Sequence, residues 1–225
     1  MDLEPTTTGG SLIGLLEAGG PIMYVLAALS VLATAIVLAK LLRFALRGSG
    51  PGWRTRVALE AWEAGRGEEA LRLLEGDRSP AAPALARAAA GRLSGDTPES
   101  RLREEASRLA QRQLDGVASG LKALALVATL SPLLGLLGTV IGMIDAFRAM
   151  EAAGSRVDPS ILSGGIWVAL LTTAAGLVVA IPAAAAHGLL EAHADHAARG
   201  FEDALTRIFT RGPAAAQPRA RLAAE

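Results

Sequence analysis

The sequence predicts an all-α integral membrane protein with three membrane-spanning helices. Of its 225 residues, 51% are hydrophobic and the mean hydropathy is +0.37, which is too apolar for an ordinary soluble domain. The apolar residues gather in three long runs without a charged residue. Most charged residues lie between the first two runs and after the third, which predicts long helices that extend into the cytoplasm.

The first uncharged run, residues 18–39, is long enough to cross a bilayer. Its 22 residues rise by about 33 Å as a helix. Acidic but no basic residues precede it, whereas Lys40, Arg43 and Arg47 follow it. Segments 40–122 and 187–225 together hold 20 of the 22 basic residues. The positive-inside rule therefore predicts a periplasmic N-terminus and a cytoplasmic C-terminus.

The polar insert after the first span is predicted to be helical. Val57–Glu75 and Ala84–Leu93 are each expected to form one helix. A further helix should start at Thr97–Pro98, because the hydroxyl can cap it and proline fits its first turn. Gly116 and Gly120 lower helix propensity there, but we expect one long helix to pass through both and enter the membrane.

The second uncharged run, Ala123–Ile144, contains the sequence LGLLGTVIGMI. Gly138 and Gly142 stand four residues apart in it, and Gly135 extends the same smooth face. This spacing favours close packing of two membrane helices. Thr139 lies between the two glycines and supplies a hydroxyl group.

The third uncharged run, Pro159–Ala186, has 28 residues and should therefore tilt or protrude from the membrane. Thr172 and Thr173 lie within it, and Pro182 interrupts its far end. The residues expected to support helix packing here are Ala169, Gly176, Ala180 and Pro182. One side of this helix should face protein or a polar pore rather than lipid. Alternatively, the threonine hydroxyls bond back to carbonyls of their own helix.

An amphipathic helix is predicted at His187–Arg211 and a disordered tail at 212–225. The apolar face of that helix should hold Leu190, His193, Ala197, Phe201, Ala204 and Ile208. The predicted organisation is a periplasmic segment (1–17), span 1 (18–42), a cytoplasmic insert (43–121), span 2 (122–146), a periplasmic loop (147–160), span 3 (161–186), the amphipathic helix (187–211) and the tail (212–225).

The sequence contains no motif of a known catalytic site, so we expect no enzyme activity and no cofactor. His193 and His196 lie beside Asp195, but without further ligands a solvated helix face is favoured over a metal site. The equal numbers of basic and acidic residues, 22 each, argue neither for nor against nucleic acid, and we expect no nucleic-acid partner. The three runs contain no Asp, Glu, Lys, Arg or His, so a proton could cross here only if another chain supplied the acid.

The motif pair LGLLGTVIGMIDAF and GIWVALLTTAAGLVVAIPA, together with three spans and a large insert, resembles the ExbB/TolQ branch of the MotA/TolQ/ExbB proton-channel family. The resemblance is strong over about residues 120–200 and rests on architecture alone over 1–119. The stators of the MotA branch usually carry four spans, which favours the ExbB/TolQ branch.

The resemblance implies an inner-membrane ring, five-fold in this family, whose second and third spans line a pore. A dimer of single-span ExbD- or TolR-like subunits would sit in that pore, and its membrane aspartate would carry the proton. The family's pore threonines match Thr139 and Thr173. Proton flow would deliver force to a TonB- or TolA-like or gliding-machinery protein, for outer-membrane transport, envelope maintenance or gliding.

One position departs from the family pattern. Many members carry a glutamate five residues before the matched threonine of the third span, where this chain has Val168. A non-conducting membrane scaffold that organises partner proteins is therefore the alternative to a proton-conducting motor subunit.

Overall fold

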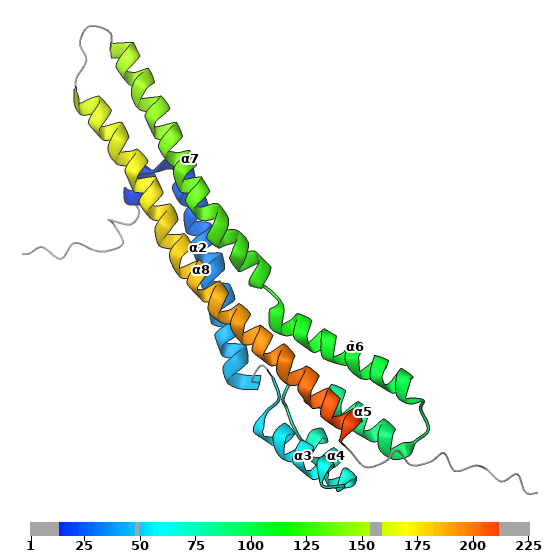
Figure 1. Cartoon of the computed structure of the whole chain (residues 1–225). Helices are drawn as coiled ribbons and strands as arrows, with labels where there is room; N and C mark the ends of the chain where they lie inside the picture. Colours follow the sequence, from blue (N-terminus) through cyan, green and yellow to red (C-terminus); the bar gives the residue numbers. More distant parts are fainter. Residues whose placement is uncertain (1–13, 48–49, 154–158, 212–225) are drawn as a thin grey trace, which may run out of the picture. The chain divides into compact units, whose positions relative to one another are not determined.

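The structure, a computed structural model, describes residues 14–47, 50–153 and 159–211 (Figure 1). The predictions for 1–13, 154–158 and the tail at 212–225 fall outside this part of the chain. Within it every element is a helix, and no strand occurs. The helices are α2 (Gly20–Arg47), α3 (Trp53–Glu63), α4 (Gly67–Glu75), α5 (Ala82–Ser94), α6 (Glu99–Ala118), α7 (Leu121–Ala153) and α8 (Pro159–Thr210).

The predicted all-α class is confirmed for the described residues, and the number of candidate membrane spans agrees with the three that were predicted. Three stretches are long and apolar enough to cross a membrane, namely Gly20–Leu46, Glu99–Ala153 and Leu162–Thr210. The described residues divide into two compact units, one within Met1–Ala39 and Gly120–Gly188 and the other within Lys40–Ser119 and Leu189–Glu225.

In the first unit, α7 and α8 pack side by side in antiparallel directions (Figure 1). Gly176 of α8 lies against Ser131 near the start of α7, and Gly165 lies against Ala146 near its end. A proline stands inside each helix, Pro132 in α7 and Pro182 in α8.

Pro182 does not break the helix of the third span, contrary to the predicted interruption. The helix α8 continues unbroken through it to Thr210. A proline removes only one backbone hydrogen bond, and packing against neighbouring helices can hold the remaining helix together. Pro182 itself is exposed on α8 and lines a shallow groove there together with Ser30 and Thr34 of α2.

The second unit has a core of alanines and a few large side chains. Trp62, Leu85 and Ile208 are 0% exposed, and Phe201 is 1% exposed. The predicted apolar face of the last helix supplies Leu190, Ala197, Phe201, Ala204 and Ile208 to buried positions, while His193 is exposed. Burial of this stripe explains why the helix is amphipathic over its final turns.

Two helices predicted to be continuous are broken at glycines. Val57–Glu75 forms α3 and α4, which are separated at Gly65 with φ +79°. The long helix predicted from Thr97 onwards ends at Ala118, and α7 begins at Leu121 after Gly120, whose φ is also +79°. Glycine alone adopts this left-handed conformation without steric cost, so both glycines end a helix rather than weaken it.

The last turn of α6 is closed by cations from α2. Lys40 is only 6% exposed, and its Nζ donates to the carbonyl of Val117 at 2.6 Å and to that of Gly116 at 3.2 Å. Nη1 of Arg43 donates to the same Gly116 carbonyl at 2.8 Å. These groups satisfy carbonyls that have no partner inside the helix.

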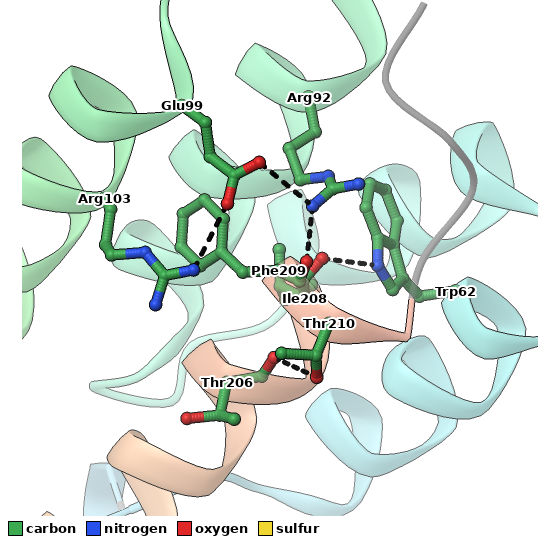
Figure 2. Close-up of polar contacts among 8 residues, drawn as sticks. All are labelled: Trp62, Arg92, Glu99, Arg103, Thr206, Ile208, Phe209 and Thr210. Atoms are coloured by element: carbon green, nitrogen blue, oxygen red, sulfur yellow. Dashed lines mark hydrogen bonds and ion pairs between the residues drawn. The ribbon is translucent and has the colours of Figure 1, made fainter.

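The end of α8 is closed in a similar way by side chains from the rest of the unit (Figure 2). Nε1 of Trp62 donates to the Ile208 carbonyl at 3.0 Å, and Nη1 of Arg92 donates to the Phe209 carbonyl at 2.6 Å. The guanidinium of Arg103 lies 4.7 Å from the centroid of the Phe209 ring. The final turn of the longest helix is thereby tied to α3, α5 and α6.

An ion pair between α3 and α8 predicts a dependence of stability on pH. Nε of Arg207 donates to the Glu63 carboxylate at 2.7 Å. This hydrogen bond, aided by the charges of Arg207 and Arg211 and opposed by desolvation, holds the pKa of Glu63 below its ordinary value of 4.5. The stability from this pair is therefore fully present above that ordinary value and is lost as the pH falls through the lowered pKa.

Glu63→Gln is expected to lower the melting temperature of the detergent-purified chain at pH 7. It should have no effect at a pH well below the lowered pKa, where the Glu63 carboxyl is protonated in both the folded and the unfolded state. Glu68→Gln, an exposed carboxylate of α4, is the matched control and should not change the pH profile. An equal loss for Glu63→Gln at both pH values would show that charge is not the cause.

Candidate functional site

The contact between α7 and α8 is the candidate functional site, and its two faces are made of small residues. We name it the small-residue seam. On α7 it consists of Ser131, Gly135, Gly138, Gly142 and Ala146, and on α8 of Gly165, Ala169, Thr172, Thr173 and Gly176. On α7 these positions recur every three or four residues, and so do Gly165, Ala169, Thr172 and Gly176 on α8, which places each set on one face. Thr173 directly follows Thr172 and lies at the edge of that face.

The seam brings the two backbones unusually close. A Cβ atom placed on Gly135 would lie 2.9 Å from the Thr172 carbonyl oxygen and 3.1 Å from the Cα of Thr173. One placed on Gly176 would lie 2.6 Å from the Ser131 carbonyl oxygen. Side chains larger than hydrogen are excluded at both glycines, as expected for helices held together by backbone contact in a membrane.

Thr172 fills the space that Gly138 leaves open. A Cβ atom on Gly138 would lie 2.5 Å from Thr172 Oγ1 and 2.6 Å from Thr172 Cβ. The side chain is 0% exposed. Its hydroxyl donates to the Ala169 carbonyl of its own helix at 2.8 Å and lies 3.4 Å from the Gly135 carbonyl. Thr172, predicted to line a pore, is thus placed inside the seam.

Thr173 and Thr139 are only partly buried. The Thr173 hydroxyl donates across the seam to the Gly135 carbonyl at 3.3 Å. The Thr139 hydroxyl donates to the Leu136 carbonyl of its own helix at 2.6 Å. Thr139 stands one helical turn after Gly135, so the two hydroxyls lie on the same side of α7, about one turn apart.

The other predicted packing residues occupy different surroundings. Gly142 meets Ala169, whose Cβ would lie 3.4 Å from a Cβ on the glycine. Ala180 is 5% exposed, whereas Pro182 is exposed. Val168, at the position of the family's glutamate, is partly buried.

Sequence reasoning missed three members of the seam, Ser131, Ala146 and Gly165. A Cβ on Gly165 would collide with Ala146. The signal was present, because Gly142 and Ala146 repeat the four-residue spacing of the glycine motif, and so do Gly165 and Ala169. The hydroxyl of Ser131 donates to the Val127 carbonyl at 2.7 Å, so this serine is satisfied within its own helix.

The histidines take no part in this site. His193 and His196 are exposed on α8, and the ring centroid of His193 lies 4.9 Å from that of Phe44. Within the described residues no group of three His, Cys, Asp or Glu side chains has the geometry to hold a metal ion.

Fold and seam together define a helical membrane protein whose second and third spans pack through glycine, alanine and threonine. Residues 77–203 match the MotA/TolQ/ExbB proton channel family, and the chain belongs to this family, in its ExbB/TolQ branch. The matched segment includes the whole seam.

Curated relatives agree with this membership. The chain is 40% identical over 127 residues to Biopolymer transport protein exbB1 of Vibrio cholerae serotype O1, a match that covers 56% of each chain. It is 33% identical over 174 residues to a Putative biopolymer transport protein ExbB homolog of Methanothermobacter thermautotrophicus, covering 76% of this chain and 60% of that one. It is 39% identical over 79 residues to the Tol-Pal system protein TolQ of Haemophilus influenzae, covering 35% of this chain and 34% of that one. The first two matches thus span 56% and 60% of the relatives' length.

Proposed function

We propose that this chain is the ring-forming inner-membrane subunit of a motor driven by the proton-motive force. Five copies would form the ring, with α7 and α8 around a central pore. Family membership and three apolar helices support this function. The relatives' printed names, which refer to biopolymer transport and to the Tol-Pal system, support a role in energising an envelope process.

The observation that carries the proposal is the placement of two hydroxyls in a membrane segment without a titratable group. Thr139 and Thr173 lie on the same side of α7 and are partly exposed. A hydroxyl can both donate and accept a hydrogen bond, so it can solvate a proton held by another group. We assign the proton pathway to these two threonines and assign Thr172 to helix packing.

The acid must come from a partner chain, because no Asp, Glu or His lies in the uncharged run of either α7 or α8. A dimer of single-span ExbD- or TolR-like subunits, each with a membrane aspartate, meets this requirement. Movement of that dimer within the ring would then be passed to a TonB- or TolA-like or gliding-machinery protein in the envelope.

The proposed topology follows from the distribution of charge. The N-terminal segment and the loop between α7 and α8 would be periplasmic, and the insert at 43–121 and the residues after 187 cytoplasmic. Segments 40–122 and 187–225, which contain these two parts of the chain, hold 20 basic residues, and this distribution supports the orientation.

A second function, that of a non-conducting scaffold with the same fold, is favoured by Val168. The valine cannot take up or release a proton, whereas the glutamate that many relatives carry there can. The motor subunit would conduct protons and the scaffold would not, whereas both would assemble into the same ring.

The deciding experiment is the native mass of the full chain purified in detergent, with and without a co-expressed single-span partner that carries a membrane aspartate. We expect a homo-oligomeric ring that captures fewer partner chains than it has subunits. A monomer or dimer that ignores the partner would refute the ring. Proton flux through the purified complex in vesicles then separates motor from scaffold.

A further inference from the structure

Two arginines line a pocket of about 600 Å³ in the second unit. It is bounded by the end of α2, the loop between α4 and α5, and α6. Arg43 and Leu46 line it from α2, Asp77 and Arg78 from the loop, and Gln113 from α6. None of these side chains belongs to the seam or to the proposed proton pathway.

The arginines have donors to spare. Arg43 uses one N–H on the Gly116 carbonyl, at 2.8 Å, and a guanidinium carries five. Arg78 is exposed and forms no ion pair with any described residue. Two arginines thus line one pocket. Arginine is suited to phosphate groups, which it binds with paired hydrogen bonds.

Asp77 is the one acidic side chain that lines the pocket, and its charge is already partly compensated. Its Oδ2 accepts hydrogen bonds from the hydroxyls of Thr55, at 2.5 Å, and Ser79, at 3.0 Å. Its Oδ1 accepts one from the Ser79 N–H at 2.9 Å, and one lone pair of that oxygen remains for a hydroxyl donor. The pocket therefore suits an anion that also carries hydroxyl groups.

The position of the pocket along α2 indicates where such an anion would come from. Arg43 stands four residues after Ala39, the last residue of the first uncharged run, which is about 6 Å along the helix. Leu42 and Leu46, on the same stretch of α2, are 62% and 73% exposed. Basic and apolar side chains alternating at the end of a span lie at the depth of the lipid headgroups.

We propose that this pocket binds the phosphate of an anionic phospholipid whose headgroup carries hydroxyls, as in phosphatidylglycerol. Arg43 and Arg78 hold the phosphate, Asp77 accepts a headgroup hydroxyl, and Leu46 contacts the start of the acyl chains. Basic pockets at the ends of membrane helices recognise headgroups in this way. The site is independent of proton conduction and of the ring.

The test measures lipid binding to the full chain in detergent. Phosphatidylglycerol is titrated in, and native mass spectrometry records how much of it is bound. Wild type should bind phosphatidylglycerol more tightly than phosphatidylcholine. Arg78→Gln should weaken phosphatidylglycerol binding by about five-fold or more, the effect of one cation near an anionic headgroup. Arg78→Lys keeps the charge but lacks the paired donors, so its affinity for phosphatidylglycerol should lie between those of wild type and Arg78→Gln.

Arg108→Gln is the matched control, because Arg108 is an exposed arginine of α6 outside the pocket. It should bind the lipid as wild type does. Equal binding by wild type, Arg78→Gln and Arg108→Gln, or equal loss in both variants, would overturn the proposal. Unchanged melting temperatures in phosphatidylcholine show that the variants are folded.

The phosphate group in the pocket could belong to a phospholipid or to a soluble phosphate compound. Competition with inorganic phosphate distinguishes these two ligands. If the lipid is the ligand, millimolar phosphate should leave phosphatidylglycerol binding almost unchanged. If phosphate displaces the lipid from wild type, and Arg78→Gln removes this effect, the pocket takes a soluble phosphate and the assignment to a phospholipid is overturned.

Discussion

Gly138→Leu is expected to destabilise the first unit by about 3 kcal/mol, at the upper end of the range for overpacking. Even the Cβ of the leucine would lie 2.5 Å from Thr172 Oγ1 and 2.6 Å from Thr172 Cβ. Thr172 is β-branched and 0% exposed, so its side chain has little freedom to move away. Thermal unfolding of the purified protein in detergent measures the loss, and native mass reports its effect on assembly.

Gly164→Leu is the matched control for this substitution. Gly164 lies in the same membrane segment of α8, and no atom lies within 4 Å of a Cβ built on it. The same change should therefore keep the melting temperature or raise it, since leucine favours a helix over glycine by up to about 1 kcal/mol. If both variants unfold at the wild-type temperature, the two helices do not depend on the seam for their packing.

Thr173→Val is expected to reduce proton flux by at least about ten-fold while leaving assembly intact, if the hydroxyl takes part in proton transfer. Valine has nearly the shape of threonine and keeps the contacts of the side chain. It removes only the hydroxyl, which donates to the Gly135 carbonyl at 3.3 Å. The measurement is proton uptake by vesicles that contain the chain together with the proposed aspartate-bearing partner.

Thr172→Val separates this effect from a general one, because it makes the same change at the neighbouring residue. Its hydroxyl is buried and donates to the Ala169 carbonyl at 2.8 Å, so its loss should cost about 1 kcal/mol of stability and leave the flux unchanged. Equal flux in wild type and Thr173→Val would remove Thr173 from the proton path. Equal losses of flux in the two variants would point to packing instead.

The spans and their packing faces were predictable from the sequence because both depend on local properties. Uncharged runs of 22 residues or more indicate membrane helices. The glycine spacing of Gly138 and Gly142 indicated a close helix partner, and their neighbours in the structure are Thr172 and Ala169 of α8. The apolar stripe that ends in Phe201 and Ile208 similarly predicted a buried face.

The helix breaks and the placement of individual hydroxyls were not predictable. Gly65, Gly116 and Gly120 look alike in the sequence, yet only Gly65 and Gly120 adopt a positive φ. The choice depends on tertiary contacts, such as those that Lys40 and Arg43 make with the end of α6. Thr172 and Thr173 are adjacent, and a rotation of about 100° on the helix decides which one is buried.

The closure of α6 by two cations has an electrostatic consequence. The aligned peptide groups of a helix place a partial negative charge of about half an electron at its C-terminal end. Lys40 and Arg43 bring two positive charges to that end, and the ammonium of Lys40 is shielded from solvent. A shielded interaction of this kind is screened little by salt. The end of α6 therefore keeps its partner at the ionic strengths at which exposed ion pairs of the same unit, such as Arg66 with Glu69, are weakened.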